Sequence, residues 1–209
     1  MQGGVVMWPL LVCSVLAIAL IIERGVFWYR VYRRQQRLLQ EVIKLYRLEP
    51  TLVPAKLKQY RDVPMARIFL SAVELEDPNP EEFRLALESE AQAEIPSLKR
   101  FSNIFDTIIA LSPLLGLLGT VLGLINSFSS LNLGDVGGTS AAGVSAGISE
   151  ALVSTASGLV VAIFTLVFAN IFRGLYQRQM ALIQEYGGQM ELIYRRNRDR
   201  QGVPYASAR

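Results

Sequence analysis

Residues 112–128 have the sequence SPLLGLLGTVLGLINSF, in which glycines and hydroxyl-bearing residues recur among leucines and valines. This stretch lies in an uncharged block from Thr107 to Ile125, which has about the length that crosses the hydrocarbon layer of a bilayer. At 100° per residue, its small residues share one helix face, with Thr120 at the edge. Small residues let membrane helices pack closely, although a GxxxG pair alone also fits ordinary helix packing. The face comprises Ser112, Gly116, Gly119 and Gly123.

A second uncharged block runs from Ala151 to Phe172 and repeats this design, with Glu150 directly before it. Its small residues form a stripe about 80° wide on a helical wheel. A polar stripe of Glu150, Ser154 and Ser157 lies beside it, and the remaining face is made of Leu, Val, Ile and Phe that suit lipid. The small stripe comprises Ala151, Thr155, Gly158, Ala162, Thr165 and Ala169.

A third uncharged block, residues 5–22, stands near the N-terminus. It is followed by Glu23-Arg24 and then by a stretch rich in arginine and aromatic residues. No basic residue precedes the block and no small-residue cleavage pattern follows it, so we interpret it as a membrane helix with an interface anchor rather than a signal peptide. The sequence therefore predicts three transmembrane helices.

The basic residues predict the orientation of these helices. All 21 Lys and Arg lie in residues 24–100 or from residue 173 onward. The positive-inside rule places both basic regions in the cytoplasm, so the N-terminus and the loop after the second span face outward, into the periplasm if the cell has two membranes. We thus predict an all-α, polytopic membrane protein with a cytoplasmic helical domain. Its segments are a first transmembrane helix (1–23), the cytoplasmic domain (24–104), a second transmembrane helix (105–128), a periplasmic loop (129–146), a third transmembrane helix (147–172) and a cytoplasmic C-terminal helix and tail (173–209).

Within the cytoplasmic region, apolar and charged residues alternate at helical spacing. The runs Gln35–Glu49 and Glu81–Glu94 predict amphipathic helices. Between them, residues 77–81 (DPNPE) form a break followed by a helix start, at which Asn79 or Asp77 is suited to cap the helix. We expect two or three helices here, some of them extending the membrane helices. The tail is expected to be helical to about Asn197 and disordered beyond it.

The composition argues against several function classes. Hydrophobic residues make up 51% of the 209 residues, charged residues only 19%, and the mean hydropathy is +0.31. There is no histidine, which removes the commonest general base and metal ligand. The single Cys13 is interpreted as a packing residue. The net charge of +3 is too small to indicate nucleic acid, and no nucleotide loop, metal spacing or nucleophile–base set is present. We expect no enzyme activity, cofactor, metal or nucleic-acid partner.

Three polar residues remain as candidates for chemistry. A carboxylate such as Glu150 at the membrane boundary is costly and tends to face protein or water, which suits proton handling. Alternatively, Glu150 stays wet at the boundary or complements the helix dipole as a first-turn residue. The hydroxyls of Thr120 and Thr155 either bond across the second and third helices or satisfy a carbonyl one turn back.

The two motifs resemble the second- and third-helix signatures of the ExbB/TolQ/MotA proton-channel family. The first is residues 112–128, and the second is residues 147–159, GISEALVSTASGL. The segment from Gly4 to Arg24 is similar to the first helix of ExbB-type members, so the resemblance covers all three spans in order. It departs from the family at Ser145-Ala146, where a proline usually precedes Gly147, and this suggests that the third helix starts earlier.

The resemblance implies a multi-pass protein of the cell inner membrane that assembles as a ring, with a pentamer around two helices of an ExbD- or TolR-like partner. A membrane Asp of that partner takes up and releases protons, and Thr120, Glu150 and Thr155 match the positions of the proton pathway. The proton-motive force then drives motion that a TonB- or TolA-like protein passes to the outer membrane.

Three alternatives stay open at this stage. A TolQ-like role in envelope integrity would use the same machine with another partner. A passive oligomeric scaffold would use the small faces for assembly alone. A flagellar stator usually has four spans, whereas three are found here.

Overall fold

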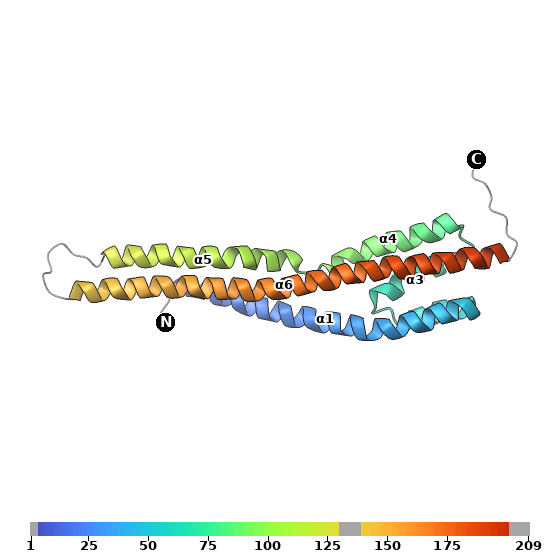
Figure 1. Cartoon of the computed structure of the whole chain (residues 1–209), viewed down its shortest axis with the longest axis horizontal. Coiled ribbons are helices and arrows are strands. Elements are labelled where there is room, and N and C mark those ends of the chain that lie inside the picture. Colours follow the sequence, from blue (N-terminus) through green and yellow to red (C-terminus); the bar gives the residue numbers. More distant parts are fainter. Residues whose placement is uncertain (1–3, 130–138, 201–209) are drawn as a thin grey trace, which may run out of the picture. The chain divides into compact units, whose positions relative to one another are not determined.

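The computed structural model describes residues 4–129 and 139–200, which form helices joined by short turns. Three stretches are long and apolar enough to cross a membrane: Met7–Leu48, Pro80–Ser129 and Gly143–Asp199. This confirms the predicted all-α class and three helices able to span a membrane. The elements, shown in Figure 1, are α1 (Met7–Leu48), η1 (Pro50–Leu52), α2 (Val53–Lys58), α3 (Pro64–Val73), α4 (Pro80–Leu98), α5 (Ser102–Ser129) and α6 (Thr139–Arg200).

The chain divides into two units, and α1 and α6 contribute to both. Residues 1–24 and 101–173 form one unit, and residues 25–100 and 174–209 form the other. The first holds the three apolar blocks and is called the apolar unit. The second holds nearly all the Lys and Arg and is called the charged unit.

In the apolar unit, α5 lies beside the first half of α6 (Figure 1). At the end of this unit where α5 begins, Leu20, Phe105 and Ala169 form a buried cluster against which Phe101 packs. Phe101 has a φ of +67°, in the left-handed region that is unfavourable for a bulky residue. Its packing, together with the Arg24 guanidinium 5.6 Å from its ring centre, stabilises the turn that separates α4 from α5.

The charged unit has the core of a water-soluble helical protein. Its fully buried side chains are large and apolar, and α3 packs against both α2 and α4. A buried Glu94 on α4 forms a two-pronged ion pair with Arg67 on α3, and hydrogen bonding to this carboxylate raises the pKa of the Arg67 guanidinium. The fully buried residues include Leu38, Val42, Val53, Leu57, Met65, Ile68, Phe69, Phe83 and Met190.

Asn79, one of the two cap residues that the sequence offered, caps α4. Its side chain accepts a hydrogen bond of 2.8 Å from the backbone N–H of Glu82. The Glu82 carboxylate in turn accepts one of 2.7 Å from the Asn79 N–H, which completes a capping box with Pro80 in the first turn. Asp77, the alternative cap, instead takes a φ of +44° in the preceding turn. The predicted runs in 35–49 and 81–94 are also helical over residues 35–48 and 81–94.

The predicted loop 129–146 is too long. α5 runs to Ser129 and α6 already begins at Thr139, so residues 139–146 are helical. These residues contain no proline to stop the helix. The Ser127 hydroxyl reaches the Val144 carbonyl at 3.5 Å, which ties the two helix ends together. The rest of that loop, 130–138, and the tail from 201 lie outside the described residues.

Candidate functional site

The small face of α5 is the surface that packs inside the apolar unit. Its four predicted members are all buried, and Ser127 continues the row one turn further. The opposite side of α5 exposes large apolar side chains, including Leu114, Leu117 and Leu118 at 60%, 58% and 48%. This inversion is what a helix in lipid requires, because leucine gains nothing from burial there. The buried members are Ser112, Gly116, Gly119, Gly123 and Ser127.

The small stripe of α6 faces inward in the same way, with one shift from the prediction. Ser154, which the helical wheel assigned to the neighbouring polar stripe, is fully buried, while Thr155 is half-buried at the edge. The centre of the packed face is therefore rotated toward Ser154, by about one residue position, relative to the predicted small stripe. Its buried members are Ala151, Ser154, Gly158, Ala162, Thr165 and Ala169.

The two faces approach so closely that backbone meets backbone. A methyl group added at Gly158 would lie 2.5 Å from the Ser112 carbonyl oxygen and 3.2 Å from the Gly116 Cα. A methyl group at Gly123 would lie 3.0 Å from both the Ala151 Cβ and the Gly147 carbonyl oxygen. At Gly158 only glycine fits without a shift of the facing backbone, and at Gly123 a larger residue would be in tight contact with α6.

Hydroxyl groups from α6 cross to one carbonyl of α5. Thr155 Oγ1 donates to the Gly116 carbonyl oxygen at 3.1 Å, and Ser154 Oγ lies 3.3 Å from the same oxygen while donating to Ala151 at 2.8 Å. Thr120 Oγ1 instead donates within α5, to the Leu117 carbonyl at 2.7 Å. Thr155 thus bonds across the helices, whereas Thr120 satisfies a carbonyl of its own helix. Both hydroxyls use consecutive carbonyls of the same α5 turn.

These hydrogen bonds leave the threonine hydroxyls able to accept. A hydroxyl has one donor hydrogen and two acceptor lone pairs, and here each hydrogen is held by a backbone carbonyl. Thr120 and Thr155 are half-buried rather than sealed in the helix interface. The edge that they form is thus suited to receive a hydrogen bond from a protonated group, such as a carboxylic acid.

Glu150 does not sit in the first helical turn. Because α6 begins at Thr139, Glu150 lies about three turns into the helix, and the interpretation as a first-turn residue complementing the helix dipole is wrong. Its side chain is half-buried, and its carboxylate lies against the backbone of Gly4. A methyl group at Gly4 would lie 3.3 Å from the Glu150 Cδ and would clash with Oε1.

Gly4 and Val6 are neighbours of the site that the sequence reasoning missed. Gly4 has a φ of +64°, which only glycine adopts at little cost, and the turn that it makes brings the chain over Glu150. Val6 is buried, and a methyl group at Gly119 would lie 3.7 Å from its Cβ. The one available signal was the glycine pair at residues 3–4 directly before an apolar helix.

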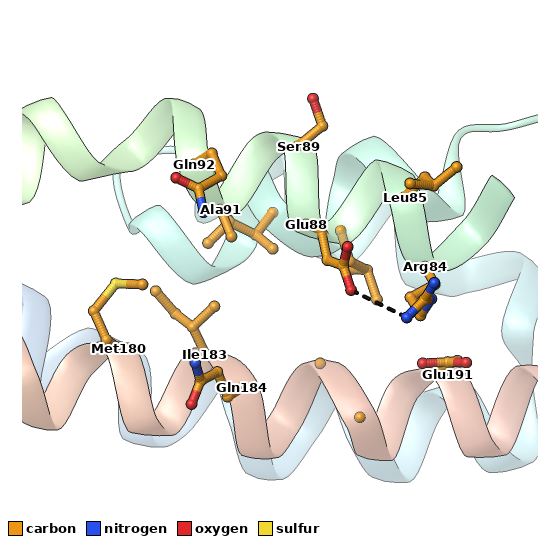
Figure 2. Close-up of a pocket in the computed structure, with 14 residues that line it drawn as sticks. Arg84, Leu85, Glu88, Ser89, Ala91, Gln92, Met180, Ile183, Gln184 and Glu191 are labelled. Carbon is orange, nitrogen blue, oxygen red and sulfur yellow. Dashed lines mark ion pairs between the residues drawn. The ribbon is translucent and has the colours of Figure 1, made fainter. Parts of the chain in front are cut away.

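A separate cavity of 710 Å³ lies between α4 and α6 in the charged unit (Figure 2). Gly187 and Gly188 leave its α6 wall open, since nothing lies within 4 Å of where their side chains would begin. On the α4 wall, Arg84 pairs with Glu88 at 3.6 Å, as Figure 2 shows. The sequence did not predict this cavity, and it contains none of the candidate site residues.

Comparisons with known proteins agree with these features. Residues 60–185 match the model of the family described as the MotA/TolQ/ExbB proton channel family. The chain is 61% identical to an ExbB-like biopolymer transport protein of Synechocystis, over the full length of both. A second such protein of Synechocystis is 41% identical over 93% of this chain and 77% of its own length. The biopolymer transport protein ExbB of Salmonella typhimurium is 39% identical over 48% of this chain and 40% of its own length.

Proposed function

Because this chain belongs to the MotA/TolQ/ExbB proton channel family, we propose that it is the channel subunit of a motor driven by the proton-motive force. It is a multi-pass membrane protein of a proton-channel family and not an enzyme. In the proposed assembly, several copies, by family resemblance five, form a ring in the inner membrane. The ring surrounds an ExbD-like subunit and passes its motion to TonB.

The proposed orientation follows from the distribution of charge. Residues 1–23 contain no Lys or Arg. Residues 101–172, which hold the second and third apolar blocks and their connection, contain none either. The basic segments 24–104 and 173–209 then face the cytoplasm, and the connection between α5 and α6 faces the periplasm. Glu150 lies on the periplasmic side in this arrangement, and Arg24 and Arg173 mark the cytoplasmic boundary.

One observation carries the proposed proton pathway. Thr155 and Thr120 hold the consecutive carbonyls of Gly116 and Leu117, at a point where α5 and α6 are in backbone contact. Their free acceptor lone pairs suit a protonated carboxyl of the partner, which would exchange hydrogen bonds with them as it passes. Glu150 would take up the proton near the outer boundary. Each proton crossing gains about 2.3 kcal/mol per 100 mV.

The experiment that tests this proposal measures proton flux in vesicles that contain the chain with the ExbD-like subunit that copurifies with it. Thr155→Val removes a hydrogen bond to a neutral carboxyl group, worth ~0.5–1.5 kcal/mol, and should lower the flux by about two- to tenfold. Glu150→Gln removes the group proposed to take up the proton and should lower the flux at least as much. Thr107→Val is the matched control, since its exposed hydroxyl donates only to Asn103 one turn back. Assembly is checked by copurification and native mass.

The outcomes separate a motor from a scaffold. Loss of flux in the two site variants, with the complex intact and Thr107→Val active, supports the pathway. Full flux in both site variants would exclude these residues from it. A complex that forms normally but conducts no protons, in the wild type as well as in the variants, would favour a passive scaffold. A TolR-like rather than an ExbD-like copurifying subunit would reassign the machine to envelope integrity.

A further inference from the structure

We propose that a pocket beside α1, lined by three arginines, binds the phosphate head group of an anionic phospholipid. This inference goes beyond the proposed function, since proton conduction does not require it. The pocket lies within the charged unit and has a volume of 480 Å³. Its lining residues are Arg33, Arg34, Arg37, Gln59 and Tyr60.

The pocket combines charged and uncharged donors from two elements. Arg33 and Arg37 are one turn apart on α1, while Gln59 and Tyr60 come from the end of α2 and the turn that follows it. Arginine presents a planar fork of donors that matches phosphate oxygens in pairs. The Gln59 amide and the Tyr60 hydroxyl add neutral donors to the lining. This set suits an anion with several oxygen acceptors.

Charge in the pocket is not balanced by the protein. Arg34 pairs with Asp62. Among the described residues, no carboxylate forms an ion pair with Arg33 or Arg37, and like charges four residues apart on a helix repel each other. In contrast, the nearby Lys56 and Lys58 both pair, with Glu41 at 2.8 Å and Glu74 at 2.9 Å. The two unpaired guanidinium groups therefore leave net positive charge that a bound anion would neutralise.

The position of the pocket along α1 favours a lipid over a free anion. In the sequence of this one helix, the apolar block 5–22 comes first, then aromatic residues, then the arginines. Tyr29 is 65% exposed and lies about 8 Å along the helix from Arg24, near the head-group layer. Helical side chains lean toward the helix N-terminus, so Arg33 and Arg37 lean toward the bilayer side of their own positions. Basic clusters directly after a membrane helix on the cytoplasmic side recognise anionic lipids.

The test measures lipid retention by the full chain in its detergent-solubilised complex. Native mass spectrometry would follow phosphatidylglycerol, with phosphatidylcholine as the uncharged-lipid comparison. The double variant R33Q/R37Q should bind phosphatidylglycerol about thirtyfold more weakly, because each surface arginine contributes about a fivefold factor. The matched control is K44Q/R47Q, which removes the same charge from exposed positions of α1 outside the pocket and should retain the lipid.

Each outcome decides the proposal. Equal retention of phosphatidylglycerol by R33Q/R37Q and wild type would overturn it, as would equal loss in K44Q/R47Q. A shift in melting temperature caused by inorganic phosphate, undiminished by phosphatidylglycerol, would assign the pocket to a free anion and not to a lipid. Helical content by circular dichroism confirms that the variant is folded. A failure here leaves the proton-flux experiment unaffected, because the Thr155→Val variant keeps this pocket.

Discussion

The contact between α5 and α6 in the apolar unit and the core of the charged unit bury different kinds of residue. At the α5–α6 contact, glycine, alanine, serine and threonine are inside and the leucines of α5 face outward, whereas in the charged unit phenylalanine, leucine and methionine are inside. The same helices, α1 and α6, take part in both units. The difference teaches that each segment is built for its own solvent. Water drives large apolar groups together, whereas lipid offers no such drive and leaves close backbone packing to hold the helices.

The largest expected effect comes from removing a large buried side chain in the charged unit. Phe69 on α3 is fully buried, so Phe69→Ala should lower the free energy of unfolding by about 3–5 kcal/mol. The matched change in the apolar unit is Phe128→Ala, where the side chain is 66% exposed. It should cost less than about 0.5 kcal/mol, as expected of a surface substitution. Thermal unfolding in detergent measures both, and equal losses would break the comparison.

The next effect tests the apolar unit by adding one carbon. Gly158→Ala places a methyl group 2.5 Å from the Ser112 carbonyl, a backbone atom that cannot swing away, so α5 and α6 must separate. We expect a loss of about 3 kcal/mol, at the upper end for overpacking. Gly174→Ala has nothing within 4 Å of the new methyl group and should stabilise the helix by up to about 1 kcal/mol. The two glycines should thus shift the melting temperature in opposite directions.

The periodicity of the sequence was enough to predict features that are determined within a single helix. It predicted three helices able to span a membrane, the small faces of α5 and α6, and a cap for α4 at Asn79 or Asp77, because each of these depends on spacing within one element. It placed the start of α6 at residue 147 instead of Thr139, because the serine, threonine and glycine in residues 139–146 have weak helix propensity. It also could not find Gly4 against Glu150, since nothing local links residues so far apart in sequence.

The same limit applies to hydrogen bonds between helices. The wheel left two choices for Thr120 and Thr155, because the decision depends on how close the partner helix comes. Gly116 allows α6 to approach, so Thr155 reaches its carbonyl, whereas Thr120 turns back to its own helix. Ser154, placed in a separate polar stripe, is buried in the packed face because its neighbours are glycines.

A third prediction concerns buried polar groups, which the two units satisfy differently. In the charged unit, Gln179 on α6 donates to the Gln35 side chain on α1 at 2.8 Å, and both are buried. Gln179→Leu would leave Gln35 unpaired and should cost about 2 kcal/mol. The double variant Q35L/Q179L removes both polar groups and should recover most of this loss. A double variant as unstable as the single one would show that the pair itself stabilises the unit.

The apolar unit supplies the control for that prediction. Buried Ser112 donates at 2.8 Å to the Ile108 carbonyl of its own helix, so no side chain on another helix depends on it. Ser112→Ala should therefore change stability by less than about 1 kcal/mol, because the carbonyl keeps its helical hydrogen bond.

The smallest expected effect is at the start of α4, where the charged unit uses a device suited to water. Asn79→Ala removes the cap and one half of the capping box, and should cost about 1 kcal/mol. Ser89→Ala, at an exposed position of the same helix, should change stability by less than about 0.5 kcal/mol. Amide hydrogen exchange sharpens the result, since the Glu82 N–H loses its acceptor when Asn79 is replaced. Faster exchange at Glu82, with the α5 amides unchanged, would confine the effect to the charged unit. Equal acceleration in α5 would mean that the two units unfold together, and that their different cores belong to one cooperative structure.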